Sequence, residues 1–317
     1  MTERDSEKAQ SVEADADPFA TFATRALRWV GTRVDQFGFP SAHSGSVLPL
    51  VKPIGELAIL CDLLLRFPKE SSFHGLGRAW LERAWEKLEA GAFLTKLVSQ
   101  RPDHVYRVST YLPFQRRGLR SKPFEDVVRR ALASPGIVAL EYFGWPGLEL
   151  ACSLAELGIK APARWTIGHA FRETWLYQRP PPASITDFSA YSLTHTVFYL
   201  TRFGETPEHL PAKHRQYLAR WVPVWGEYYY RRQHWDLMSE MVMVLRCLGE
   251  KDDRDWAGRL WAAQSESGLI PGPTGDGRHL DPRCTDPERI HFLENYHPTL
   301  VGLMAALLSL ERSAGQR

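Results

Sequence analysis

Residues 56–67 read ELAILCDLLLRF, a glutamate followed by an apolar run of helical length. A titratable residue occupies a similar place before five further runs, at His104, Glu149, His195, Glu240 and His297. The successive intervals are 48, 45, 46, 45 and 57 residues. A repeat of about 46 residues suits a pair of α-helices with two connections. The pattern therefore predicts a closed ring of six helix pairs, with the repeated Glu or His positions facing one shared cavity.

The fold class that this repeat predicts is all-α, an (α/α)6 toroid in which outer and inner helices alternate. The outer segments are charged on one face, whereas the inner segments are apolar all round, as expected for helices shielded by a second layer. The expected outer helices span about 18–38, 74–90, 123–133, 161–176, 212–231 and 253–265. The expected inner helices span about 54–67, 104–113, 147–157, 191–203, 236–248 and 297–311. The second of these is rich in β-forming residues, so a strand or an irregular helix is the alternative there.

Composition limits the class of protein. The chain has 317 residues, of which 44% are hydrophobic and 24% charged, so it has ample material for a sizeable core. Residues 1–17 are polar and acidic and are expected to form a disordered tail, which leaves 18–317 as a single domain. A net charge of +2 gives no electrostatic reason to expect nucleic acid as a partner. No apolar run is long enough for a membrane span, and no signal peptide is evident, so we expect a cytoplasmic protein.

Two smaller groups of residues have plain structural interpretations. No cysteine belongs to a CxxC motif, and most lie within apolar helical runs, so they are expected to be buried thiols in a reducing compartment rather than a zinc site. The four cysteines are Cys61, Cys152, Cys247 and Cys284. A short basic cluster is expected to be a solvated loop. It consists of Arg116, Arg117, Arg120 and Lys122.

The repeated positions supply the candidate catalytic residues. His195, within Thr-His-Thr, is a candidate general base or metal ligand, and the alternative is a histidine that hydrogen-bonds a neighbouring loop. Asp236 and Glu240 are four residues apart and share one helix face, so Glu240 is a candidate acid or base, while Asp236 either orients a histidine or caps a helix. His297 precedes Pro298 and is expected near a helix N-terminus, where the helix dipole lowers the pKa of an imidazole.

Two kinds of chemistry are open to this set. His195, His297 and Asp236 could supply two imidazoles and one carboxylate to a divalent metal, with Glu240 as the other carboxylate choice. The metal-free alternative pairs a glutamate and a histidine as acid and base, with pKa values separated by burial. No nucleotide cofactor is expected. The pattern sets neither the substrate nor the oligomeric state.

Further residues are expected to bind the substrate. Glu149 and Glu56 begin earlier inner helices, where each could instead be a first-turn partner of the helix dipole. The expected substrate-binding residues are Glu149, Glu56, Tyr191, Trp235 and Tyr296. Two long segments, 177–190 and 268–296, precede inner helices and are expected to cover the same end of the ring as functional loops.

The alternation of helices resembles the toroids of terpenoid cyclases, protein prenyltransferase β-subunits, lanthionine cyclases and several glycosidases. Residues 264–272, QSESGLIPG, are similar to the Gln…Gly…Gly turn repeat of the terpenoid cyclases, but occur once and lack its final Trp. The catalytic motifs of these families are missing, since the chain has no DxDD or DDxxD motif and no Cys-His pair with the zinc spacing of lanthionine cyclases.

A closer resemblance is to an uncharacterised actinobacterial all-helical family, sometimes found beside genes of specialised metabolism. It depends on YSLTHTVFYLTRFG at 191–204, WDLMSE at 235–240 and NYHPTLVG at 295–302. The resemblance implies an all-helical fold and supplies no activity. The leading hypothesis is a small-molecule enzyme of natural product biosynthesis, a cyclase, lyase, isomerase or hydrolase. The alternative is a non-catalytic helical-repeat protein that binds a peptide or carrier-protein partner.

Overall fold

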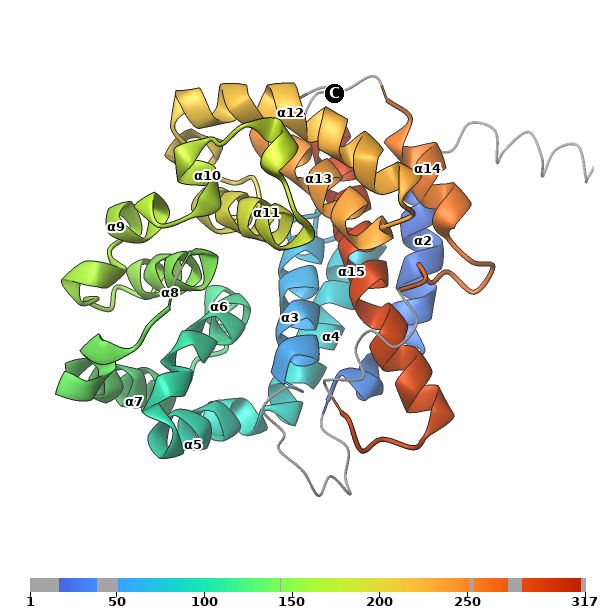
Figure 1. The fold of residues 1–317 in the computed structure, drawn as a ribbon. Coiled ribbons are helices and arrows are strands. Elements are labelled where there is room, and N and C mark those ends of the chain that lie inside the picture. Colours follow the sequence, from blue (N-terminus) through green and yellow to red (C-terminus); the bar gives the residue numbers. More distant parts are fainter. Residues whose placement is uncertain (1–16, 39–50, 143, 251–253, 273–280, 315–317) are drawn as a thin grey trace, which may run out of the picture.

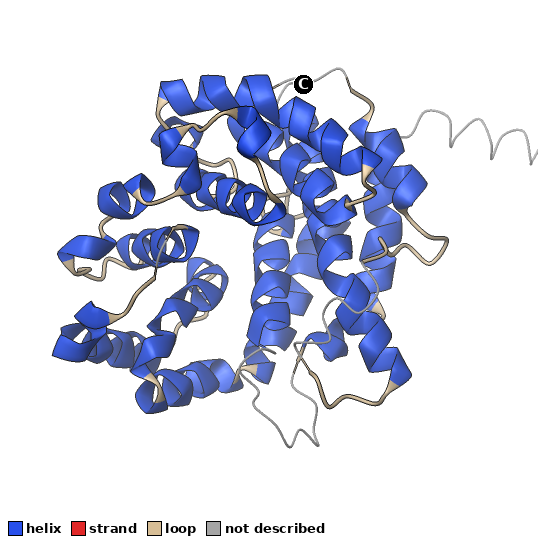
Figure 2. Ribbon diagram, in the orientation of Figure 1, coloured by secondary structure: helices blue, strands red, loops and turns tan. Residues whose placement is uncertain are grey.

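The chain is helical throughout the part that the structure describes. A computed structural model describes residues 17–38, 51–142, 144–250, 254–272 and 281–314. These residues form 14 α-helices and seven 3₁₀ helices, and none of them lies in a strand (Figure 2). The all-α prediction is therefore confirmed. The expected disordered tail lies outside the described residues except for Asp17. The Asp17 side chain accepts a hydrogen bond from the Phe19 N–H and caps the helix α2 (Pro18–Gly31).

Six helices contact one another in a closed cycle (Figure 1). In chain order they are α3 (Val51–Leu64), α6 (Val108–Arg116), α8 (Trp145–Glu156), α11 (Asp187–Thr201), α13 (Trp235–Leu248) and α15 (Pro287–Ala314). Each packs against the next, and α15 packs against α3. These six correspond to the six expected inner helices. The finer assignment to the (α/α)6 toroid class stays a prediction.

A second set of helices packs against this cycle. Its α-helices are α2 (Pro18–Gly31), α4 (Ser72–Lys87), α5 (Ala92–Gln100), α7 (Lys122–Ala133), α9 (Ile167–Arg172), α10 (Trp175–Gln178), α12 (Ala212–Arg231) and α14 (Trp256–Ala263). The 3₁₀ helices are η1 (Val34–Phe37), η2 (Glu89–Gly91), η3 (Pro102–Arg107), η4 (Pro135–Ala139), η5 (Ala163–Trp165), η6 (Pro182–Ser184) and η7 (Pro207–His209). Helix α4 packs on α3, α9 on α8, α10 on α11, α12 on α13 and α2 on α15, while α7 packs on α5.

Burial follows the two layers. In α13, of the inner cycle, 12 of 14 residues are buried. In α12, which covers it, the six buried residues form one stripe from His214 to Tyr229 at helical spacing. An apolar helix must be covered on every side, whereas an amphipathic helix needs a partner on one face. This difference between their sequences places α13 in the inner layer and α12 in the outer layer.

Several predicted boundaries are wrong, and local chemistry explains them. The segment 177–190 is not one long loop, because α11 begins at Asp187, after a capping box formed by Thr186 and Ser189. The segment 268–296 is helical from Pro287, after Asp286 accepts a hydrogen bond from the Glu288 N–H. The segment 104–113 is not a strand, since η3 is followed directly by α6. Helix α5 was not expected.

Helix α15 continues through Pro298, which was expected to begin it. Proline lacks the N–H that would bond the carbonyl four residues earlier, here that of Glu294. Gly272 packs against this carbonyl so closely that a Cβ on Gly272 would lie 2.0 Å from the oxygen. The N–H of Gly272 is held by the Asn295 side chain at 3.0 Å. Because Gly272 has no side chain, its segment can pack against the Glu294 carbonyl, which Pro298 leaves without its usual helical hydrogen bond.

An ionic network lies at the C-terminal ends of the inner helices. Arg116 on α6 contacts Asp62 on α3 at 2.7 Å and binds Glu156 on α8 through two of its nitrogens. Arg202, which follows α11, lies 3.5 Å from Glu156. Arg117 joins Asp62 at 2.7 Å. The expectation of a solvated basic loop is thus wrong for Arg116 and Arg117, because their guanidinium groups neutralise carboxylates that would otherwise be buried alone.

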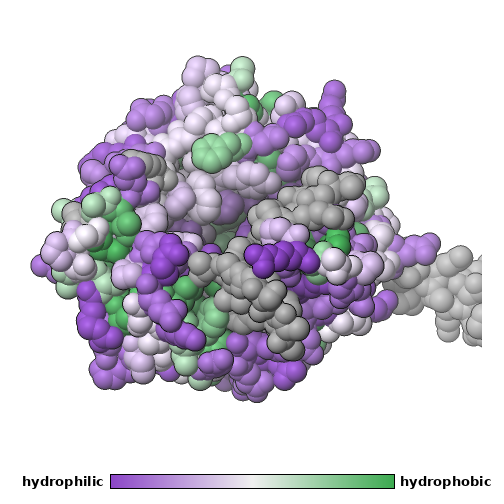
Figure 3. Space-filling model, turned by 60° about the horizontal axis from the view of Figure 1, so that its bottom comes forward, coloured by the Kyte–Doolittle hydropathy of each residue, from purple (hydrophilic) through white to green (hydrophobic). Residues whose placement is uncertain are grey.

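No helix in the described ranges combines the length and apolar character needed to cross a bilayer. Figure 3 shows one face, on which hydrophilic side chains predominate and apolar side chains form separate patches. The four cysteines are unpaired, with Cys61 and Cys247 buried and Cys152 and Cys284 partly exposed.

Removing the Arg116 charge should destabilise the fold. Arg116→Met would leave Asp62 and Glu156 with one basic partner each, so we expect a loss of about 3 kcal/mol in the free energy of unfolding, measured by urea titration. Arg83→Met is the matched control, because Arg83 pairs with Asp35 and Glu86 where both partners are exposed. Equal stability of the two variants would contradict a structural role for the network.

Candidate functional site

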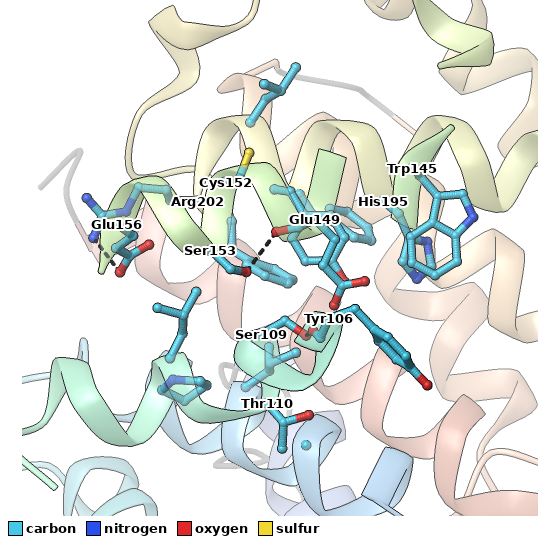
Figure 4. A pocket seen from close by; sticks show the side chains of 18 of the residues that line it. Tyr106, Ser109, Thr110, Trp145, Glu149, Cys152, Ser153, Glu156, His195 and Arg202 are labelled. Carbon is cyan, nitrogen blue, oxygen red and sulfur yellow. Dashed lines mark hydrogen bonds and ion pairs between the residues drawn. The ribbon is translucent and has the colours of Figure 1, made fainter. Parts of the chain in front are cut away.

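A cavity of about 820 Å³ lies between four inner helices. It is lined by residues of α3, η3, α6, α8 and α11, including Glu56, Ser109, Glu149 and His195 (Figure 4). A volume of this size is typical of pockets for drug-sized ligands. Three of the residues singled out from the sequence, Glu56, Glu149 and His195, therefore face one internal space.

One part of the cavity wall is aromatic. The ring of Trp145 lies against the imidazole of His195, with 4.4 Å between ring centroids, and Tyr199 lies 6.1 Å from the same imidazole. Figure 4 shows Trp145 beside His195. Both aromatic residues lie one helical turn from a titratable one, Trp145 before Glu149 and Tyr199 after His195. This i, i+4 spacing was the sequence signal that could have identified them as cavity residues.

A half-buried carboxyl group, that of Glu149, lies on the same wall. Burial raises the pKa of Glu149, and hydrogen bonds with Ser109 and Tyr199 partly offset this effect. Glu149 is the fifth residue of α8, and Glu56 the sixth of α3, so neither lies in the first turn. The alternative of simple helix-dipole partners is therefore wrong for both glutamates.

His297 lies between two carboxylates. Its Nδ1 is 3.1 Å from Glu56 Oε2 on α3, and its Nε2 is 3.4 Å from Asp236 Oδ1 on α13. Because His297 itself belongs to α15, the imidazole joins three consecutive helices of the cycle. The Glu56 side chain also has Lys52 at 3.7 Å, one turn earlier on α3.

Each carboxylate of α13 has a hydroxyl partner on α11. The Tyr191 hydroxyl donates to Asp236 Oδ2, and the Thr194 hydroxyl donates to Glu240 Oε2. Both carboxylates are buried, with 5% of Asp236 and 2% of Glu240 exposed. Asp236 does not cap α13, since that position belongs to His234, whose Nδ1 accepts from the Leu237 N–H. The capping alternative for Asp236 is thus excluded by geometry.

His195 connects this cluster to the cavity. Its Nδ1 lies 2.9 Å from the carbonyl oxygen of Tyr191, which can only accept, so Nδ1 carries the proton and Nε2 is the free acceptor. The same Nδ1 lies 3.9 Å from Glu240 Oε2. His195 is the ninth residue of α11 and not at its start, because α11 begins earlier than expected.

The electrostatic environment gives the two histidines, His297 and His195, very different pKa values. Burial alone would lower the pKa of His297, but the carboxylates of Glu56 and Asp236 outweigh burial and raise it to about 9. Burial lowers the pKa of His195 to about 4, and its bond to the Tyr191 carbonyl does not reverse that effect. At neutral pH His297 is therefore an imidazolium and His195 a neutral imidazole. The expected lowering of the His297 pKa by a helix dipole is wrong, since His297 lies well inside α15.

The pKa values of two glutamates in the cluster, Glu56 and Glu240, are also shifted in opposite directions. Burial would raise the pKa of Glu56, but His297 and Lys52 outweigh it and lower the pKa to about 2. Burial, followed by the neighbouring Asp236 charge, raises the pKa of Glu240 to about 8. At neutral pH the cluster therefore contains a glutamate that is ionised and another that is largely protonated, as acid–base sites require.

A glutamine at position 240 should change how stability depends on pH. For Glu240 the folded-state pKa of about 8 exceeds the ordinary value of 4.5, so folding favours the neutral acid. Its contribution to stability is complete below pH 4.5 and is lost as pH rises toward 8. Glutamine is neutral throughout, so Glu240→Gln should gain at least ~3 °C in Tm relative to wild type between pH 5 and pH 8.

The measurement is a set of thermal melts of both proteins in the presence of a chelator. A large drop in Tm for Glu240→Gln at both pH values would mean that Glu240 is the charged half of a structural pair, contrary to this description.

The structure brings together most of the residues expected from the sequence, but not all. His195, Asp236, Glu240, His297 and Glu56 form one interacting group, hereafter the Glu/His cluster. Tyr191 contacts the cluster through its hydroxyl, and Tyr296 helps to lower the pKa of Glu56. Trp235 instead packs on Tyr230, with ring centroids 6.0 Å apart, and is not a lining residue of the cavity.

Other expectations are corrected by the same geometry. No residue of 177–190, nor of the described part of 268–296, lines the cavity, and residues 273–280 lie outside the described residues. The sequence interpretation missed Thr194 and Lys52, although Thr194 directly precedes His195 and Lys52 lies one turn before Glu56. The three side chains whose ligand atoms lie within 4.8 Å of one another are Asp236, Glu240 and His297, so Glu240 takes the place expected for His195.

The fold and site define an all-helical protein with an internal cavity and a buried Glu/His cluster. The chain belongs to the family described as Domain of unknown function (DUF6895), whose model matches residues 23–307. Comparison with curated proteins gave no match, and neither did comparison with solved structures.

Proposed function

We propose that this protein is an enzyme that transfers protons to or from a small molecule held in the internal cavity. The observation that supports it most is that His195, with its proton fixed on Nδ1, lies on the cavity wall beside a buried cluster of opposite charges. A neutral imidazole with a free Nε2 is a proton acceptor, and a buried charged cluster stabilises the charge that forms when it accepts.

The cavity wall indicates the chemical character of the substrate. Trp145, Phe198 and Tyr199 offer apolar faces, while Glu149 and Ser109 offer hydrogen-bonding groups a short way along the wall. A molecule with an apolar or aromatic body and one hydroxyl, carbonyl or amine group would match both parts. The half-buried carboxyl of Glu149 would orient the polar group, and the aromatic wall would hold the body.

The broader context is also part of the proposal. We infer that the closed cycle of inner helices is an (α/α)6 toroid, and that the reaction is a cyclisation, elimination, isomerisation or hydrolysis in specialised metabolism. The four unpaired cysteines fit a reducing, cytoplasmic compartment. Support for the toroid comes from the helix contacts and from the regular interval between Glu/His positions.

A conversion assay with a His195 variant tests the function. The purified chain would be incubated with pooled small molecules that carry an apolar ring and one polar group, and products followed by mass spectrometry. We expect a compound to be converted, and His195→Gln to slow conversion at least ~100-fold, because the proton acceptor is gone. His169→Gln is the matched control, since His169 is an exposed histidine that contacts Glu173 outside the cavity.

Binding without conversion separates the alternatives. If ligands that stabilise the protein are returned unchanged by wild type, the catalytic proposal is wrong and the protein is a binding protein, as the peptide- or carrier-binding alternative from the sequence also held. If His195→Gln converts them at the wild-type rate, His195 is not the proton acceptor and the proposed mechanism is wrong.

A further inference from the structure

We propose that Asp236, Glu240 and His297 are the ligands of one divalent transition-metal ion, with positions left open for water or substrate. The binding site stands on its own geometry, and only its catalytic use depends on the proposed function. This ligand set differs from the one that the sequence suggested, because it contains both carboxylates of α13 and a single histidine.

The first support is the distance between ligand atoms. One atom from each of the three side chains lies within 4.8 Å of the other two. Ligand atoms about 2.1 Å from a metal ion are at most ~4.2 Å apart, so the present arrangement needs only a small inward movement of the side chains. Asp236 and Glu240 lie one turn apart on α13, and His297 faces them from α15, so backbone movement is not required.

The second, independent support is that residues outside the ligand set form a hydrogen bond or ion pair with each ligand side chain and so fix its orientation. His297 directs Nδ1 to the Glu56 carboxylate at 3.1 Å, which leaves Nε2 facing Asp236. A histidine that binds a metal through one nitrogen commonly donates the other N–H to a carboxylate, which fixes its tautomer and ring orientation. Glu56 holds that position here.

The two carboxylates are oriented in the same manner. Asp236 receives the Tyr191 hydroxyl on Oδ2, and Glu240 receives the Thr194 hydroxyl on Oε2. Each ligand thus has an outer partner on a neighbouring helix, α3 for the histidine and α11 for the carboxylates. An arrangement in which every ligand is held from outside is typical of metal sites and is more than a group of acids would provide.

Charge gives the third support. Asp236 and Glu240 are buried one helical turn apart, so the two carboxylates would repel each other if both were ionised, and a cation between them would remove that repulsion. Without metal the imidazolium of His297 supplies the positive charge and Glu240 keeps its proton. A divalent ion would replace the Nε2 proton of His297 and the carboxyl proton of Glu240, which are both released to solvent, and would balance both carboxylates.

The ligand types indicate the class of metal. One imidazole and two carboxylates suit Zn²⁺, Mn²⁺ or Fe²⁺, whereas Ca²⁺ and Mg²⁺ prefer oxygen ligands alone. Three protein ligands leave at least one position open, as in catalytic rather than structural sites. His195 lines the cavity and its Nδ1 is 3.9 Å from Glu240, so this residue connects the metal site to the cavity, whose lining includes none of the three ligands.

Direct metal binding tests the inference without any substrate. The full chain would be stripped with a chelator, dialysed, and titrated with Zn²⁺ and Mn²⁺ by calorimetry, with bound metal counted by elemental analysis. We expect one equivalent of metal per chain, and little binding of Ca²⁺ or Mg²⁺. Glu240→Gln removes one ligand, and should weaken the affinity at least ~100-fold.

A variant outside the ligand set makes the test sharper. Glu56→Gln keeps all three ligands, and should weaken affinity ~10- to 100-fold because His297 loses the carboxylate that holds it. Glu173→Gln, at the exposed His169 contact, should have no effect, and melting curves would confirm that every variant is folded. Less than a stoichiometric amount of metal, or equal binding by wild type and Glu240→Gln, would overturn the inference.

The outcomes also separate this inference from the proposed function. If no metal binds but His195→Gln abolishes conversion, the metal site is wrong and the acid–base function stands. If metal binds as expected and no conversion depends on His195, the site stands and the function is wrong. If His195→Gln weakens metal binding as much as Glu240→Gln does, the assigned ligand set is wrong.

Discussion

The imidazole of His297 lies between the carboxylates of Glu56 and Asp236, and this contact joins α15, α3 and α13 at the end of the internal cavity. Charges at this depth are stable only when they are paired, so the three helices must present these side chains to one another. Burial has the larger effect on the other groups in the cluster. Burial, followed by the neighbouring Asp236 charge, keeps Glu240 largely neutral, and burial keeps His195 a neutral imidazole at the cavity wall.

Polar groups in the ring of inner helices occupy two separate levels, and both reach the cavity, whose lining includes Arg116 and Glu156 at one level and Glu56 and His195 at the other. At the C-terminal ends, Arg116 and its carboxylate partners form direct ion pairs between helices and neutralise one another's charges. In the Glu/His cluster, by contrast, Asp236 and Glu240 also have the hydroxyl groups of Tyr191 and Thr194 as partners. We propose that the first level stabilises the fold and that the second takes up a cation or exchanges protons with a substrate.

Much of the fold could be predicted from the sequence, because apolar runs such as that after Glu56 can only be inner helices. Helix ends were harder, since the start of α11 depends on a capping box with Ser189 in place of the usual Glu or Gln, and α15 continues through Pro298. Of the six regularly spaced Glu and His positions, five lie in the Glu/His cluster or line the cavity, whereas His104 lies beside Asp103 and does neither. Their pairing could not be predicted, because His297 and Glu56 are 241 residues apart and nothing local indicates their contact.

The protonation states of His297 and His195 are the most direct test of this account. Nitrogen-15 NMR of protein labelled at histidine, recorded in the presence of chelator, distinguishes an imidazolium from each neutral tautomer. The account predicts that His297, assigned through a His297→Gln variant, stays doubly protonated at pH 7 and loses its proton near pH 9, while His195 is neutral with its proton on Nδ1. A neutral His297 at pH 7, or a His195 protonated on Nε2 alone, would contradict the charge arrangement on which the proposed site depends.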